Sequence, residues 1–240
     1  MEIKQVKASL EEIEWAKNTG QANSPDCLNG EIINDPALEK YLDSLVKKVL
    51  SRAPSYFKGF AYKVRVIKNP WLYALAFPNG EIFIGSKFFY SLEFEDVLVG
   101  MLAHEISHVA LRHKIGEFQM SRKLQNEQLK FVGKAKDFAR IENRNSVLLA
   151  KYFQYHETES DLMAIRILLM VGYDASKYSE YMLMHFVNDK NDKEHPSAQK
   201  RFANTSKEIE VWKRILHSWK PIPHPMINSF LEYRSTLYSR

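Results

Sequence analysis

The spacing of apolar residues divides the chain into a helical start, a short region of strands and a long helical remainder. In the first 17 residues, apolar side chains recur at helical spacing, which predicts an amphipathic helix. The polar, turn-rich stretch 18–30 has the composition of a linker. We therefore expect an N-terminal helix and linker over residues 1–30 and one domain over residues 31–240.

Residues 61–85 change from a helical to an alternating pattern. Val64 and Val66 alternate with Lys63 and Arg65, which is the period of a half-buried strand. An Asn-Pro pair and a Pro-Asn-Gly triplet mark turns around two further short apolar runs. The pattern predicts about three short strands, which we expect to form a small antiparallel sheet.

Helical spacing governs the rest of the chain. One helix is expected over about 35–52, where an Asp-Pro pair supplies the N-cap and the first helical residue. Gly172 stands where a C-terminal helix cap belongs. The later helices are expected near residues 94–114, 116–145, 147–171, 175–187 and 197–219. The predicted fold class is α+β and predominantly helical.

Composition is that of an ordinary globular protein. The 240 residues are 45% hydrophobic and 26% charged, which suits one domain with a sizeable core and excludes global disorder. The single cysteine, Cys27, excludes an intramolecular disulfide. The sequence shows neither an apolar run of roughly 20 residues nor the apolar stretch of a signal peptide. We therefore expect no transmembrane segment, and either a cytoplasmic protein or one whose leader is absent from this chain.

Positive charge is concentrated between residues 112 and 151, where ten Lys and Arg face four Asp and Glu. We favour a solvated helical face as its explanation. Contact with an acidic partner or an anionic membrane surface is the alternative. Nucleic-acid binding is not expected, because no recognition motif accompanies the charge.

The strongest chemical signal is the HEISH segment at residues 104–108, an H-E-x-x-H motif. Residues i and i+4 of a helix share a face, so His104 and His108 can bind one metal ion. Glu105 lies roughly 100° around the helix, where its carboxylate reaches the attacking water instead of the metal. Two core or surface histidines on a helix would give the same pattern, so a third ligand is needed to identify a catalytic zinc site.

Spacing tests the candidates for that ligand. A third histidine six residues after His108 is excluded, because Lys114 stands there. His113 comes one residue too early and lies off the ligand face, so we expect a structural or surface role for it. A glutamate from another helix is the remaining source.

The segment ETESD at residues 157–161 supplies that glutamate. Glu157 and Asp161 share a face that continues as an apolar stripe, whereas Glu159 lies on a face that we expect to be more exposed. Glu157 is therefore the ligand candidate, and Asp161 can accept a hydrogen bond from a ligand histidine. Burying two acids without a cation is costly, which favours a metal site over a solvated helix edge.

These blocks resemble the gluzincin-type zinc metallopeptidase family that contains the CAAX prenyl protease, HtpX and BepA. The resemblance covers roughly residues 35–205. It includes HEISHVALRH, ETESD with a serine in place of the usual alanine, and a His-Pro pair followed by Arg201. Residues 73–80 resemble the family's Asn-Ala-Phe-Ala-x-Pro-Gly-Gly strand and turn, with Tyr73 and Asn79 as departures.

The resemblance implies a zincin-like endopeptidase with an H-E-x-x-H helix and one Zn²⁺ per chain. Zinc would be held by His104, His108 and Glu157, and Glu105 would be the general base that hydrolyses protein or peptide substrates. A role in protein quality control follows from the same resemblance. So does a soluble periplasmic branch, which would place the protein outside the cytoplasm with its leader absent from this chain.

The resemblance also assigns roles around the metal. Ala74, Leu75 and Ala76 are expected to form the edge strand that pairs with substrate. His195 would either steady the oxyanion or close the fourth zinc position and keep the enzyme latent, and a plain helix-flanking histidine is the alternative. Arg201 would orient that segment or merely cover the surface.

Two other functions remain open. A zinc-stabilised binding or chaperone-like module would need no turnover, and Glu105 argues against it because a structural site has no use for that acid. An accidental motif in a helical protein is the other, and the shared face of Glu157 and Asp161 argues against it.

Overall fold

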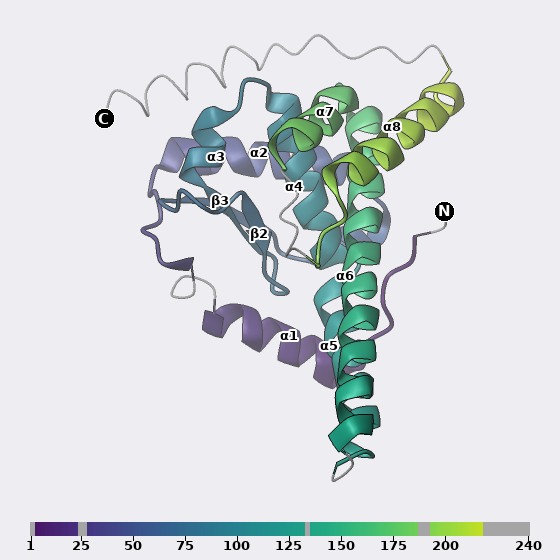
Figure 1. Ribbon diagram of the computed structural model, residues 1–240. Coiled ribbons are helices and arrows are strands. Elements are labelled where there is room, and N and C mark those ends of the chain that lie inside the picture. The colour runs from purple at the N-terminus through teal and green to yellow at the C-terminus, as the bar shows by residue number, and fades with distance from the viewer. Residues whose placement is uncertain (1–2, 24–27, 133–134, 187–192, 218–240) are drawn as a thin grey trace.

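The computed structural model describes residues 3–23, 28–132, 135–186 and 193–217, so Cys27 and the last residues of the final predicted helix lie outside it. Helices predominate around one three-stranded sheet, which confirms the α+β class (Figure 1). The helices are α1 (Leu10–Asn23), α2 (Pro36–Arg52), the 3-10 helix η2 (Ser55–Gly59), α3 (Ser86–Ser91), α4 (Glu95–Ala110), α5 (His113–Leu129), α6 (Ala135–Val171), α7 (Ala175–His185) and α8 (Ala198–Ile215). The strands are β1 (Lys63–Ile67), β2 (Ala74–Ala76) and β3 (Glu81–Gly85).

The sheet is mixed, so the expected all-antiparallel arrangement was wrong. Strand β3 lies between the other two, parallel to β1 and antiparallel to β2. The chain reverses once on entering β2 and again in the turn before β3, so β3 runs in the direction of β1. Gly80 in that turn has φ 96°, and a Cβ there would lie 2.2 Å from the Ala61 carbonyl oxygen. This topology leaves β2 at an edge of the sheet.

Several helix boundaries differ from the predicted ones: α1 ends at Asn23 inside the expected linker, and the predicted 116–145 helix is divided between α5, which ends at Leu129, and α6, which begins at Ala135. The N-terminal helix begins at Leu10, because the residues before it run along the end of α4, where the Val6 N–H donates to the Leu111 carbonyl. The predicted break near residue 146 does not occur. Asn145 is buried there and its side chain donates to the Leu124 carbonyl of α5, so this polar residue joins two helices. Helix α6 therefore runs unbroken for 37 residues.

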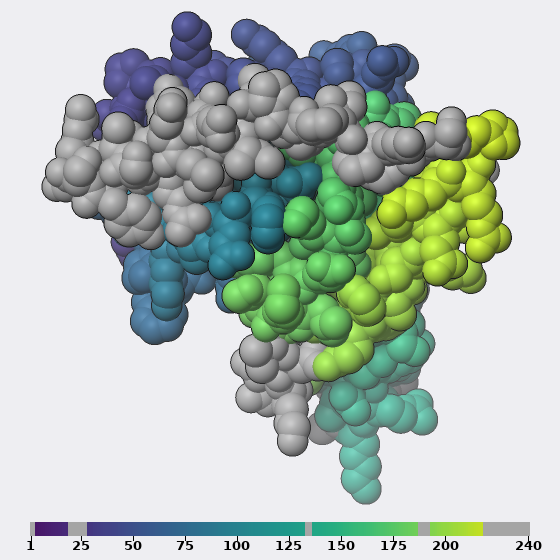
Figure 2. All heavy atoms as spheres, turned by 90° about the horizontal axis from the view of Figure 1, so that it is seen from above, coloured from purple at the N-terminus to yellow at the C-terminus, as the bar shows by residue number. Residues whose placement is uncertain are grey.

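Helix α4 lies at the centre of the core, with almost all its residues buried. It packs against α6, α7 and β2. At Gly100 an added Cβ would lie 2.5 Å from the Tyr178 ring, so the close approach of α4 and α7 requires glycine. Seen from above, α7 and α8 lie side by side on one face (Figure 2).

The basic segment 112–151 forms α5 and the first part of α6, which extend together beyond the rest of the fold (Figure 1). Within the residues that the structure describes, no helix is both long and apolar enough to span a membrane. Contact of this segment with a membrane surface stays a prediction.

Candidate metal centre

Buried hydrogen bonds fix the start of α4. Glu95 is fully buried and accepts from the Tyr41 hydroxyl at 2.5 Å and from the Tyr173 hydroxyl at 2.6 Å. Asp96 accepts from the Asp174 backbone N–H at 2.7 Å, which joins α4 to the start of α7. Because neighbouring elements satisfy both acids, the helix that carries the H-E-x-x-H motif is held rigidly.

Three donor atoms from α4 and α6 converge at one point. Nε2 of His104 lies 3.1 Å from Nε2 of His108. Oε2 of Glu157 lies 3.5 Å from the first nitrogen, and Oε1 of Glu157 lies 3.2 Å from the second. All three side chains are at least largely buried. The structure thus brings together the three residues that the sequence predicted as ligands.

The donor set and its spacing fit a zinc ion. Two imidazole nitrogens and one carboxylate oxygen are ligands that Zn²⁺ prefers, with bonds of about 2.0–2.1 Å. In a tetrahedron of such bonds the corners lie about 3.3 Å apart. The two histidine nitrogens are 3.1 Å apart, and the two Glu157 oxygens each lie near a different one of them, at 3.5 and 3.2 Å, so the separations are close to that value. The group could therefore hold a metal with little rearrangement.

The charges around His104 and Glu157 are strongly coupled. Burial disfavours the charged form of His104, but Asp161 and Glu157 outweigh it and raise its pKa to about 10. Burial likewise opposes ionisation of Glu157, yet His108 and His104 hold its pKa well below its usual range. A positive charge is thus stabilised at this point, supplied by a proton when no metal is bound.

Asp161 and Arg201 lie behind His104. The Asp161 carboxylate lies 3.0 Å from Nδ1 of His104, although the direction of that contact is poor for a hydrogen bond. Arg201 of α8 donates two hydrogen bonds to the same carboxylate and is itself buried. Burial works against ionisation of Asp161, but Arg201 and His104 hold its pKa below its usual range. Arg201 therefore does not cover the surface.

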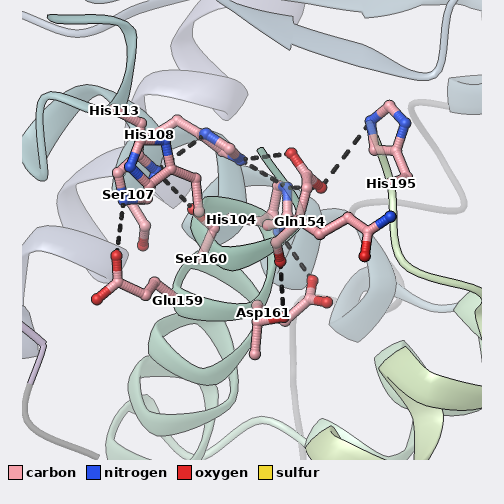
Figure 3. Close-up of polar contacts among 12 residues, drawn as sticks. His104, Ser107, His108, His113, Gln154, Glu159, Ser160, Asp161 and His195 are labelled. Atoms are coloured by element: carbon pink, nitrogen blue, oxygen red, sulfur yellow. Dashed lines mark hydrogen bonds and ion pairs between the residues drawn. The ribbon is translucent and has the colours of Figure 1, made fainter. Parts of the chain in front are cut away.

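A cleft of about 540 Å³ opens in front of the three donors. Glu105, which is largely buried, lines it together with Ala74, Leu75 and Ala76 of β2. His195 lines it as well, half-exposed, with Nε2 3.9 Å from Glu157 (Figure 3). All the predicted site residues thus surround this cleft or support a residue that does.

The free edge of β2 faces that cleft. The Tyr73 carbonyl accepts from Gly85 and the Phe77 N–H donates to Glu81, so residues 73 and 77 direct these groups toward β3. Such bonds alternate along an antiparallel strand, so the backbone N–H and C=O groups of Ala74 and Ala76 point away from β3. An extended peptide can pair with them.

The expectation that Glu159 would be more exposed was wrong, and of the two roles expected for His113, structural or surface, its burial leaves the structural one. Glu159 is buried, only 4% exposed, because α6 is covered on that side by the start of α5. His113 is buried too and lies against His108, with its Nδ1 3.1 Å from the ligand's Nδ1. Figure 3 shows Glu159 and Asp161 on different sides of the helix that carries them. Sequence reasoning also missed His156, whose ring stacks on that of His113.

Comparison with known proteins agrees with this geometry. The sequence pattern of peptidase family M48 matches residues 36–209. The beta-barrel assembly-enhancing protease of Escherichia coli O157:H7 is 30% identical over 157 residues, which cover 60% of this chain and 31% of that protein. The Yersinia pestis protein of the same name is 26% identical over 165 residues, which cover 63% of this chain and 33% of that protein. The chain thus spans about a third of the length of these relatives.

Proposed function

The chain belongs to peptidase family M48, and from this premise we propose that it is a zinc-dependent endopeptidase that hydrolyses peptide bonds of protein substrates. The observation that carries the proposal is the convergence of His104, His108 and Glu157 on one point at the wall of a cleft. Three protein ligands and an open side are what a catalytic zinc requires.

A zinc ion at this site would polarise the scissile carbonyl and lower the pKa of the attacking water toward about 7. Glu105 takes the proton from that water and passes it to the leaving amine. Its place one residue after His104 supports this role, because the carboxylate then lies beside the ligands in the cleft wall. Asp161 orients His104, and Arg201 holds Asp161 in place.

The substrate is proposed to bind as an added strand along β2. The outward backbone groups of Ala74 and Ala76 would hold it by main-chain hydrogen bonds, which demand little of its sequence. A peptide that is N-methylated at the residues pairing with Ala74 and Ala76 should be cleaved more slowly than the same peptide without methyl groups. Methylation at the residue between them should have little effect. Equal loss from both would argue against strand addition.

Extended segments of unfolded or misassembled proteins are the substrates that such an edge favours. The name of the relatives combines proteolysis with β-barrel assembly, which supports a role in protein quality control. His195 is proposed to face the substrate carbonyl, since it lines the cleft, is half-exposed and lies 3.9 Å from Glu157 beside the metal ligands. His195→Ala should then lower the rate, whereas a latency role would raise it.

Glu105→Gln is the direct test of turnover. The amide keeps the size of the side chain but cannot accept the proton, so cleavage of an unfolded protein such as casein should fall by at least about a hundredfold. Zinc content should stay at the wild-type level. A variant that cleaves as fast as wild type would refute the general-base role, and a wild type that binds zinc without cleaving anything would favour a binding module.

A further inference from the structure

Three buried side chains lie directly behind the metal centre. His113, His156 and Glu159 are 1%, 2% and 4% exposed, and one donor atom from each lies within 4.8 Å of the others. None of them lines the cleft, and the proposed hydrolysis does not use them. Two of their nitrogens, Nε2 of His113 and Nδ1 of His156, make no hydrogen bond within the described part of the chain.

The ring geometry does not suit a second metal ion. The rings of His113 and His156 are stacked, with centroids 4.1 Å apart and planes only 7° from parallel. A nitrogen lone pair lies in the plane of its ring, so two stacked rings direct their lone pairs along parallel planes. They cannot both point at one ion between them, and another role must account for the cluster.

The tautomer of His108 defines that role. Its Nε2 faces His104 and Glu157, so a metal there leaves its proton on Nδ1. That nitrogen lies 3.1 Å from Nδ1 of His113. Two N–H groups cannot face each other at this distance, so Nδ1 of His113 must be the acceptor and its own proton must be on Nε2.

The surroundings of His113 suit this tautomer. The Glu159 carboxylate lies 3.5 Å from Nε2, a contact that forms no hydrogen bond in this structure but whose negative charge favours a proton on that nitrogen. Its other oxygen accepts from the Tyr155 hydroxyl at 2.8 Å, which fixes the carboxylate. The Ser160 hydroxyl, 3.3 Å from Nδ1, is a more distant donor than His108 for the single lone pair of that nitrogen. Figure 3 shows His113 beside His108, with Ser160 and Glu159 nearby.

The backbone turn between α4 and α5 is built to make this contact. Arg112 has φ 61° and ψ 39°, a left-handed conformation that reverses the chain and returns His113 toward His108. The N-terminal segment secures the turn, since the Gln5 side chain donates to the Ala110 carbonyl at 2.6 Å and Val6 donates to Leu111. A strained turn held from outside is expected where a side chain must be placed accurately.

We propose that His113 is a positioning residue whose Nδ1 accepts a hydrogen bond from His108 and so holds Nε2 of that ligand toward the metal, with the nearby Glu159 carboxylate favouring a proton on Nε2 of His113. The proposal rests on the proposed zinc site, because the metal sets the tautomer of His108. The two histidine ligands are then supported differently: His104 by the carboxylate of Asp161 and His108 by an imidazole.

Zinc affinity of matched variants tests the proposal, measured by competition with a chromogenic chelator. His113→Leu removes the acceptor and should weaken zinc binding by about 10–100-fold. His113→Asn places an amide oxygen near the position of Nδ1 and should recover most of that loss. His156→Phe keeps a ring stacked on His113 without touching His108, so its affinity should stay within about threefold of wild type.

The outcomes separate this inference from the proposed function. A wild type that binds no zinc overturns both. If the wild type binds one zinc and a folded His113→Leu variant binds it equally well, the role of His113 is overturned but the proposed function is not. The same holds if the wild type binds a second zinc that His156→Phe removes. Should His113→Leu fail to fold, nitrogen-15 NMR of histidine-labelled, zinc-loaded wild type decides. It should show His108 protonated at Nδ1 and His113 at Nε2, and a proton on Nδ1 of His113 would refute the proposal.

Discussion

Arg201 holds Asp161 through two hydrogen bonds, from Nε at 2.8 Å and from Nη2 at 2.7 Å, deep in the protein. The pair joins α8 to α6, and the Asp161 carboxylate lies 3.0 Å from His104. Helix α8 therefore supports a candidate ligand, although it contributes none of the three converging donor atoms. Loss of either partner would leave a buried charge beside that ligand.

Arg201→Met should destabilise the protein by about 3–5 kcal/mol, because it leaves Asp161 buried without its partner. Urea unfolding of the metal-free protein measures the change. Arg214→Met is the control, since Arg214 of the same helix is exposed and its ion pair within the described residues is with exposed Glu210, and it should change stability by less than about 0.5 kcal/mol. Equal effects of the two substitutions would show that the buried pair is not important for stability.

Gly100→Ala should cost about 1–3 kcal/mol, because the new Cβ would lie 2.5 Å from the Tyr178 ring and force α4 and α7 apart. Gly59→Ala is the matched control, since a Cβ there meets nothing within 4 Å. Thermal unfolding should separate the two variants clearly. A Gly100→Ala protein as stable as wild type would mean that the two helices are not packed so closely.

Metal-free protein should lose stability as the pH rises from 6.5 to 10. The folded-state pKa of His104 is raised from 6.5 to about 10. The stability that protonated His104 contributes to the folded state is therefore fully present below pH 6.5 and is lost as the pH rises through 10. Urea midpoints in the presence of a chelator measure this loss, and His104→Asn should show a shallower fall over that range. Parallel curves for the two proteins would contradict the raised pKa.

Zinc binding at pH 7 should release at least one proton per ion. Without metal His104 carries a proton at this pH, and a ligand imidazole must give it up. Calorimetric titration in buffers with different ionisation enthalpies counts the protons released. The His104→Asn variant should release fewer, if it binds at all, and a wild-type count of zero would show that His104 is already neutral.

Local helix geometry and the H-E-x-x-H motif identified the candidate metal ligands from the sequence. His104 and His108 are four residues apart, and Glu157 shares its face with Asp161, so helical period alone placed each pair. The predominantly helical class followed from the same periodicity.

Relations between elements were not predictable in this way. The helical period shows which residues share a face of a helix, but not which other elements cover that face. Glu159 was therefore expected to be more exposed, although the start of α5 covers it. Turn signals mark where a strand ends, but not beside which strand the next one lies, so the parallel pairing of β1 and β3 was missed. The left-handed Arg112 that brings His113 to His108 had no signal, because glycine is the usual residue there.

Zinc content of the purified protein, measured by mass spectrometry for wild type and for Glu157→Ala, tests the central claim most directly. The three-ligand site predicts about one zinc per wild-type chain and a loss or strong weakening of binding in the variant. No zinc in the wild type, even after reconstitution, would contradict the metal centre and with it the proposed peptidase.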